Sequence, residues 1–203
     1  MKPAASRFLG IDEAGREILS FLPGEVPADL GHYGDDVLRT AAALLRRFHD
    51  ATEAFAPVAA AGAEVICHND WGPPNAVFRD GQPYAVIDFD TIRPGLRLWD
   101  LGYSAAAWLD LGYEDYSGAE QLRRLQIFAA AYDHPACQPT QIAAFALARQ
   151  AALAAAGHAQ GKLDLAHWAE SIARWTTANV TETLLPTGMM PKHEQPGADE
   201  IKS

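Results

Sequence analysis

The sequence predicts an α+β protein in which helices form most of the chain and short strands frame one polar loop. An apolar run at 65–67 leads into that loop. Two further apolar runs, at 76–79 and 84–87, are separated by the turn-forming sequence Asp80-Gly81-Gln82-Pro83, a pattern typical of a β-hairpin. After residue 117, apolar residues recur with helical spacing. A small hairpin beside a helical body is therefore expected.

The composition indicates a folded protein that binds neither nucleic acid nor a membrane. Of its 203 residues 49% are hydrophobic, and 16 basic against 26 acidic side chains give a net charge of −10, which disfavours contact with nucleic-acid phosphates. No signal peptide opens the chain, and no apolar run of about 18 residues predicts a membrane span. Cys67 and Cys137 are far apart in the sequence, so we expect a reducing, cytoplasmic setting.

The amino-terminal residues predict a strand pair followed by a linker. Residues 7–11 and 16–21 are largely apolar and flank the turn sequence Asp12-Glu13-Ala14-Gly15. The following stretch, 22–27, is rich in proline and glycine and is typical of a linker. Without further context, an ordinary hairpin and loop explain this segment as well as a functional hinge does.

A helix is predicted next, capped by Asp35 or Asp36. Its carboxyl end carries His49, for which a structural role is expected because a polar or cationic group is favourable there. Arginines 39, 46 and 47 are expected on the solvated face. The apolar stripe consists of Val37, Leu38, Ala41, Leu44, Leu45 and Phe48.

Four polar side chains surround the hairpin: His68, Asp70 and Asn75 in the loop before it and Asp88 after its second strand. A hairpin that starts after Asn75 brings the chain back beside the loop, so Asp70, Asn75 and Asp88 are expected to meet at one end of the sheet. Carboxylate and amide oxygens suit Mg²⁺. Asn75 and Asp88 then hold the metal, and Asp70 accepts the proton of an attacking hydroxyl, as phosphoryl transfer requires.

Asp90 is a further candidate metal ligand. It lies two residues beyond Asp88, and on a continuous strand the two side chains share a face. Anchoring of the following loop explains Asp90 equally well. Each acid taken alone could simply cap a turn, and it is the order and spacing of the set that favours a site.

These motifs resemble the aminoglycoside phosphotransferase family, small-molecule kinases with a protein-kinase-like fold. The resemblance covers residues 7–185. It rests on His68-x-Asp70-x-x-x-x-Asn75, on Ile87-Asp88-Phe89-Asp90, on Asp100-Leu101-Gly102 after Gly95, and on the run Leu44-Leu45-Arg46-Arg47-Phe48-His49.

The resemblance implies roles for these residues. Asp70 is the catalytic base, Asn75 and Asp88 are magnesium ligands, and His68 braces the loop. ATP is the phosphate donor, with its adenine bound by the backbone of a hinge. The chain departs from the family at Asn69, where a glycine is usual. By the same resemblance, the hinge candidates are Ser20, Phe21 and Leu22.

The rest of the chain is predicted to be a loop at 91–95 followed by helices. Asp100 suits the N-cap of the first helix. A role as a third metal ligand is the weaker alternative. Ser117 and Glu120 have the spacing of a capping box. Another helix follows Pro139 and runs to about residue 157. The last is opened by Asp164 and ends by residue 186, with its apolar side formed by Leu165, Trp168, Ile172 and Trp175.

The resemblance also predicts a division of the chain. Residues 1–27 correspond to the remnant of a truncated amino-terminal β lobe, 28–186 to a mostly helical carboxyl lobe with the catalytic loop and metal-binding hairpin, and 187–203 to a flexible tail. The phosphate-covering loop and the basic strand residue of the family have no counterpart before residue 7. Loss of this lid would impair phosphoryl transfer, which depends on positioning.

Three functions are compatible with these residues. The first is a phosphotransferase that moves the γ-phosphate of ATP to a hydroxyl of a small acceptor. The second is a non-catalytic module of the same fold that binds a ligand or forms a homodimer through the exposed amino-terminal sheet edge. The third is a hydrolase with a metal bound by His68, Asp70 and Asp88. The acceptor has no recognisable motif.

Overall fold

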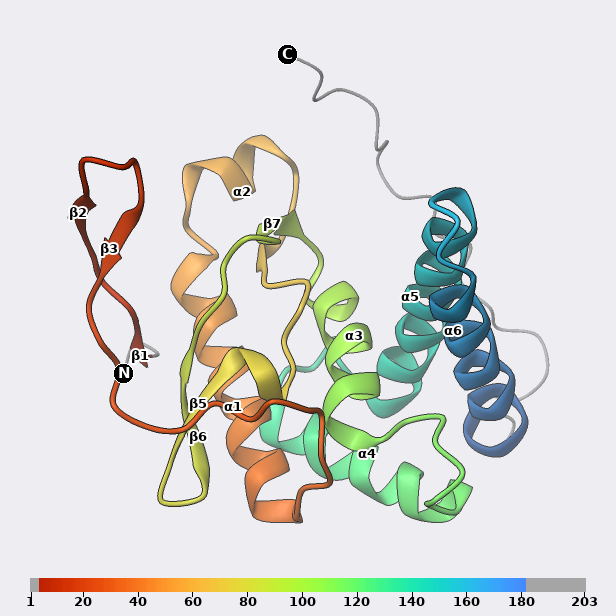
Figure 1. The fold of residues 1–203 in the computed structure, drawn as a ribbon. Helices are drawn as coiled ribbons and strands as arrows, with labels where there is room; N and C mark the ends of the chain where they lie inside the picture. The colour runs from red at the N-terminus through yellow and green to blue at the C-terminus, as the bar shows by residue number, and fades with distance from the viewer. Residues whose placement is uncertain (1–3, 182–203) are drawn as a thin grey trace.

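The computed structural model describes residues 4–181 and confirms an α+β protein that is mainly helical (Figure 1). The predicted tail at 187–203 and the predicted end of the last helix at 186 lie outside the described residues. The elements are β1 (Ala4–Ala5), β2 (Phe8–Ile11), β3 (Glu17–Leu19), α1 (Asp35–Thr52), α2 (Ala56–Ala60), β4 (Val65–Cys67), η1 (Pro73–Asn75), β5 (Ala76–Arg79), β6 (Gln82–Val86), β7 (Arg93–Gly95), α3 (Arg97–Leu109), α4 (Gly118–Tyr132), α5 (Pro139–Ala159), α6 (Leu163–Thr176) and η2 (Thr177–Thr181).

The predicted central hairpin is confirmed as the antiparallel pair β5–β6. Its turn has only two residues, Asp80 (φ 52°) and Gly81 (φ 74°), and both adopt the positive φ that such tight turns require. Strand β1 pairs in parallel with β6, and Glu25 forms a β-bridge with Phe78 of β5. The amino-terminal segment therefore pairs with part of each edge of the hairpin.

Residues 91–95, predicted as a loop, end in strand β7, which pairs antiparallel with β4. The sequence did not indicate this strand because Pro94 and Gly95 are poor strand formers. The strand forms because it pairs with β4. A Cβ built on Gly95 would lie 2.8 Å from the Sγ atom of Cys67, so only glycine fits at this close approach. The β4–β7 pair fixes the start of the polar loop.

Strands β2 and β3 form the predicted amino-terminal hairpin, which is a separate two-stranded sheet. Figure 1 shows it beside the helical body. Phe8 pairs with Leu19 and Ile11 pairs with Glu17. Phe8, Ile11 and Leu19 are 60%, 64% and 50% exposed, so this face of the hairpin lies outside the core.

Helix α1 buries the whole predicted apolar stripe. Its N-cap is Gly34 rather than Asp35 or Asp36, which occupy the first turn. Arg46 is only partly solvated, because its guanidinium pairs with Asp50 at 2.8 Å and donates to the backbone carbonyl of Tyr132 at 3.2 Å.

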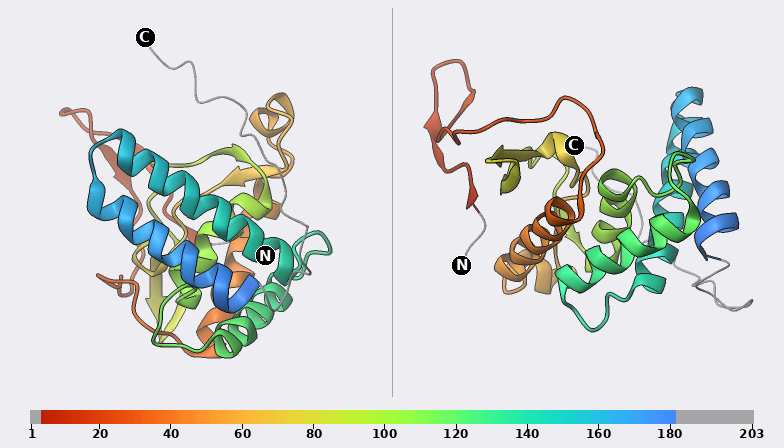
Figure 2. Two further views of the ribbon diagram at one scale, coloured as in Figure 1. Left: turned by 90° about the vertical axis from the view of Figure 1, so that its right-hand side faces the viewer. Right: turned by 90° about the horizontal axis from the view of Figure 1, so that it is seen from below.

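The remaining helices pack as pairs, with α5 against both α3 and α6 and with α1 against α4; the α5–α6 pair is seen in Figure 2. Ser117 caps α4 as predicted, accepting the Glu120 N–H at 3.2 Å. A Cβ on Gly102 would lie 2.6 Å from the backbone of Phe145, so this glycine permits the close approach of α3 and α5. The apolar side predicted for α6 holds only in part, since Ile172 is buried but Trp168 is 36% exposed.

A chain of buried polar groups links α1, α3 and α4. Arg97 donates to the Tyr132 hydroxyl at 3.2 Å, that hydroxyl lies 2.7 Å from His49 Nδ1, and His49 Nε2 lies 3.0 Å from the Asp100 carboxylate. Every group is satisfied if neutral His49 donates through Nε2 and accepts at Nδ1. Burial lowers the pKa of His49 more than Asp100 raises it, so the histidine is neutral rather than cationic.

No helix between residues 4 and 181 combines the length and the apolar character needed to cross a membrane.

The buried histidine predicts a loss of stability in mild acid. The pKa of His49 in the native state lies below its ordinary value of 6.5, so the unfolded chain binds more protons as the pH falls through that value. We expect the free energy of unfolding to decrease as the pH falls below about 6.5, because of proton uptake by this group in the unfolded chain. Urea unfolding followed by circular dichroism at a series of pH values measures the slope.

Two variants separate His49 from the other histidines. His49→Gln should flatten this part of the profile, whereas His167→Gln, at an exposed position of α6, should leave it unchanged. Equal slopes in His49→Gln and the parent protein would contradict the assignment. Should His49→Gln not fold, an NMR titration of the parent protein decides, since the midpoint of the His49 titration must lie below pH 6.5.

Candidate functional site

The polar loop between β4 and β5 is anchored by the carboxylate of Asp100 from helix α3. Asp100 Oδ2 accepts the backbone N–H of His68 at 2.6 Å, and Oδ1 accepts the backbone N–H of Asn69 at 2.8 Å. Burial raises the pKa of the Asp100 carboxyl, but the hydrogen bonds from His49 and from the His68 N–H outweigh it and lower the pKa below its usual range. An ionised, fully buried acid thus holds two consecutive backbone groups of the loop.

The N-cap role predicted for Asp100 is wrong. Leu96 is the N-cap of α3, and Asp100 lies one turn inside the helix. Both of its oxygens are occupied by backbone donors and by His49, so a third metal-ligand role does not fit either. Sequence spacing alone does not reveal this partner, because the loop and the helix are about 30 residues apart.

Asn69 adopts a left-handed conformation with φ 66°. Asparagine tolerates this region better than other residues with a side chain, which explains how it replaces a glycine here. Its Nδ2 donates to the carbonyl of Thr91 at 2.9 Å, and the Thr91 hydroxyl donates to the carbonyl of His68 at 2.7 Å. The amide of Asn69 therefore adds a contact that glycine could not make.

Asp70 and Asn75 are brought together as predicted. The amide nitrogen of Asn75 donates to the Asp70 carboxylate at 2.9 Å and to the Asp70 backbone carbonyl at 2.7 Å. Both amide hydrogens are thereby engaged, while the Asn75 side-chain oxygen accepts no hydrogen bond from the described residues. This oxygen is the group that remains to bind a cation.

Tyr103 completes the surroundings of Asp70, and the sequence did not indicate it. Its hydroxyl donates to the second carboxylate oxygen of Asp70. Burial and this hydrogen bond raise the pKa of Tyr103, so the hydroxyl stays protonated and remains a donor. In the sequence, only one feature could have pointed to Tyr103: it lies three residues after Asp100, which places both side chains on one face of α3.

Arg149 of α5 contacts the same loop and was also missed. Its guanidinium donates to the Asn69 carbonyl at 2.9 Å and lies over the rings of Trp99 and Tyr103, at 4.7 and 5.2 Å from their centroids. It forms no ion pair with a carboxylate of the described residues. The helical pattern of α5 gives no reason to single out this arginine.

The backbone of Asp88 lies beside Asn75. The N–H of Ile87 donates to the Asn75 carbonyl at 3.0 Å, and His68 Nε2 donates to the Ile87 carbonyl at 2.9 Å. His68 therefore ties the loop to the end of the hairpin. Asp88 itself is exposed, adopts φ 61°, and its carboxylate pairs with none of the described residues. Its oxygens and the Asn75 side-chain oxygen, which have no partner among the described residues, are donors of the kind that Mg²⁺ prefers.

The argument that placed Asp90 on the same face as Asp88 is wrong. Strand β6 ends at Val86, and the left-handed backbone of Asp88 breaks the alternation of side chains. Asp90 is exposed and lies in a turn. Its role as a metal ligand remains a prediction without that geometric support.

The predicted hinge residues lie just after β3. The N–H of Ser20 donates to the Arg7 carbonyl at 2.8 Å, so this backbone donor is already used. Phe21 is 85% exposed, and Leu22 is partly exposed. The linker meets the central hairpin at Glu25, whose N–H and carbonyl pair with Phe78, and at the Pro23 carbonyl, which accepts hydrogen bonds from Arg79 and Tyr84. Adenine binding by residues 20–22 remains a prediction.

A hydrolase with a metal held by His68, Asp70 and Asp88 lacks support. Between residues 4 and 181 no group of three or more His, Cys, Asp or Glu side chains could hold a metal ion. His68 uses Nε2 for the Ile87 carbonyl, and its Nδ1 is buried without a hydrogen bond. Around the Asp70 carboxylate the structure instead places the Asn75 amide and the Tyr103 hydroxyl.

Comparisons with known proteins point to one family. The model of the phosphotransferase enzyme family matches residues 2–138. A trifolitoxin immunity protein from Rhizobium leguminosarum bv. trifolii is 35% identical over 125 residues, which cover 56% of this chain. The chain spans 47% of the length of that relative.

Among solved structures, the apoenzyme of macrolide 2'-phosphotransferase from Brachybacterium faecium matches 85% of this chain and 74% of its own, with a TM-score of 0.48 and 15% identity. The family match includes the whole of the polar loop, the central hairpin and helix α3, and it extends over more than half of the sequence. The chain therefore belongs to the phosphotransferase enzyme family.

Proposed function

We propose that this protein transfers the γ-phosphoryl group of ATP to a hydroxyl group of a small acceptor, with Mg²⁺ as cofactor. The observation that carries the proposal is the Asp70–Asn75 pair, in which Asn75 gives both amide hydrogens to Asp70 and keeps its oxygen for a cation. The need for ATP also supports a cytoplasmic setting. Neither a nucleic acid nor a membrane is needed as a partner.

Asp70 accepts the acceptor's proton. The acceptor oxygen attacks the γ-phosphorus, a new oxygen–phosphorus bond forms, and the bond from the γ-phosphorus to its bridging oxygen breaks to release ADP. The proton passes to the Asp70 carboxylate and from there to water. Asn75 and Tyr103 hold that carboxylate in one orientation, which supports attack from a fixed position.

Asn75 and Asp88 are the residues that would hold the metal. Bound Mg²⁺ supplies positive charge that offsets the charge of the phosphate oxygens during transfer. His68 positions Asp88 by its hydrogen bond to the neighbouring Ile87 carbonyl. Ser20, Phe21 and Leu22 remain the candidates for contact with adenine.

The role of Asp70 predicts a selective loss of transfer. Asp70→Asn removes the proton acceptor but keeps the volume, so turnover should fall on the order of 10²- to 10⁴-fold while Mg²⁺-ATP binding is kept. Labelled γ-phosphate transfer to a panel of small hydroxylated compounds measures turnover, and calorimetry measures binding. Asp80→Asn, at the turn of the same hairpin, is the matched control. Undiminished transfer by Asp70→Asn would remove Asp70 from the mechanism.

The metal site predicts a loss of nucleotide affinity. Asp88→Asn should weaken binding of a non-hydrolysable ATP analogue in the presence of Mg²⁺ about tenfold or more, because a carboxylate ligand is lost. The same titration without Mg²⁺ should show little difference between variant and parent. Asp90→Asn tests the role of Asp90: a loss of nucleotide affinity equal to that of Asp88→Asn would make Asp90 a metal ligand. Unchanged affinity in Asp88→Asn would refute the proposed metal site.

A second candidate function is a non-catalytic module that forms a homodimer through its amino-terminal hairpin. The observation in its favour is the exposed face of β2–β3 that carries Phe8, Ile11 and Leu19, with Glu17 opposite Ile11. An isolated two-stranded hairpin is marginally stable in water, so a covering partner would stabilise it. Absence of Mg²⁺-ATP binding at millimolar concentration would favour this candidate over the enzyme.

The dimer makes its own prediction. Sedimentation at about 100 µM should show a dimer, since a standard interface has a dissociation constant well below that concentration. Ile11→Lys should raise the dissociation constant about tenfold or more, because it places a charge in the covered face. Phe55→Lys is the control, at an apolar side chain of similar exposure (51%) beside α2. A monomeric parent protein would rule the dimer out.

A further inference from the structure

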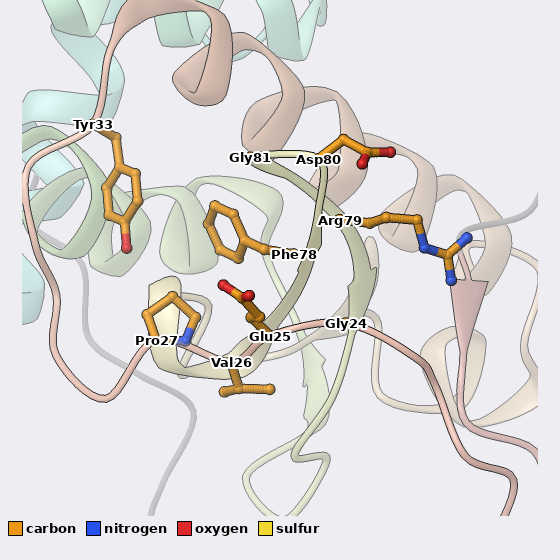
Figure 3. A pocket seen from close by; sticks show the side chains of 9 residues that line it. All are labelled: Gly24, Glu25, Val26, Pro27, Tyr33, Phe78, Arg79, Asp80 and Gly81. Carbon is orange, nitrogen blue, oxygen red and sulfur yellow. The ribbon is translucent and has the colours of Figure 1, made fainter.

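A cavity of about 680 Å³ lies at the turn end of the central hairpin, opposite the end that carries Asn75 and Asp88 (Figure 3). Its walls are the linker at residues 24–27, Tyr33, and residues 78–81 at the end of β5 and in the turn. This volume lies within the range of small-molecule sites. None of the residues that line it takes part in the proposed phosphoryl transfer.

Two aromatic rings form one wall of the cavity. The rings of Tyr33 and Phe78 are nearly parallel, with centroids 5.6 Å apart and an interplanar angle of 27°. Both rings pack against the buried Trp108, at 5.6 and 6.2 Å. The Tyr33 carbonyl is held by Arg124 at 2.9 Å, and Arg124 is itself paired with Asp110. This wall is therefore fixed from behind.

The carboxylate of Glu25 stands beside these rings. Figure 3 shows the Glu25 side chain pointing toward Phe78 and Tyr33. Two backbone hydrogen bonds to Phe78, of 2.9 and 2.7 Å, hold Glu25 in place, whereas its carboxylate forms no hydrogen bond or ion pair with the described residues. The exposed Glu25 side chain thus stands beside aromatic rings with no basic partner among the described residues.

The cavity supplies no cation of its own. Arg79 is directed away from the rings (Figure 3), and its guanidinium donates to the Pro23 carbonyl at 3.0 Å and lies 4.2 Å from the centroid of the Tyr84 ring. The Asp80 side chain is also directed away from the rings (Figure 3). The charged group that stands beside the rings is therefore Glu25.

We propose that this cavity binds a small organic cation, a primary ammonium group carried on an apolar or aromatic body. The ammonium would pair with the Glu25 carboxylate and lie over the electron-rich face of an aromatic ring, an arrangement that is favourable for cations. The apolar body would cover Tyr33 and Phe78. The proposal does not depend on phosphoryl transfer, because the cavity and the loop of Asp70 lie at opposite ends of the hairpin.

The test uses benzylammonium as the probe, with benzyl alcohol as its neutral counterpart. In an NMR titration of the full chain, benzylammonium should shift the backbone amides of residues 24–26, 33 and 78 and bind about tenfold or more tightly than benzyl alcohol. Glu25→Gln should weaken benzylammonium binding by a similar factor and leave benzyl alcohol unaffected. Glu17→Gln, the same change at an exposed position of β3, should alter the affinity for neither probe.

A second variant examines the aromatic wall. Tyr33→Leu keeps an apolar side chain but removes the ring, so it should weaken benzylammonium more than benzyl alcohol. Phe78 is left unchanged because it belongs to the core. Equal binding of the two probes, or an unchanged affinity in Glu25→Gln, would overturn the cation site. Absence of shifts in the millimolar range, where fragment-sized ligands bind, would overturn it as well.

Discussion

The two hydrogen bonds from the polar loop to the carboxylate of Asp100 are the interaction on which the rest of the site depends. A buried carboxylate and buried N–H groups are each costly unless they are paired, and here one acid satisfies His68, Asn69 and the imidazole of His49 together. Because Asp100 lies inside α3 and His49 inside α1, the loop takes its position from two helices of the core. The next residue, Asp70, is placed by this anchor.

The orientation of Asn75 follows from that placement. Asp70 offers its backbone carbonyl and its carboxylate to the same amide nitrogen, so the amide cannot turn over without losing both hydrogen bonds. The amide oxygen is then the end that stays free. In the proposed function, Asn75 thus links the proposed proton acceptor, Asp70, to the proposed metal site through one side chain.

The sequence predicted elements whose signals are local, and it missed those that exist only through tertiary contact. Residues close together in the sequence predict the central hairpin, the apolar stripe of α1 and the cap at Ser117, and all three are confirmed. Strand β7 was missed because its pairing partner, rather than its own propensity, makes it a strand. Tyr103 was missed because its hydrogen bond to Asp70 joins residues 33 positions apart.

The amino-terminal hairpin is positioned by main-chain pairing at its two ends and not by burial of its own side chains. Before it, β1 pairs with β6, and after it, Glu25 pairs with Phe78 of β5. These contacts fix the points at which the chain leaves and rejoins the central hairpin, while Ile11 and Leu19 between them remain exposed. The segment is therefore tethered to the sheet next to the site and still presents an apolar face, which is the property expected of a surface that another strand or chain covers.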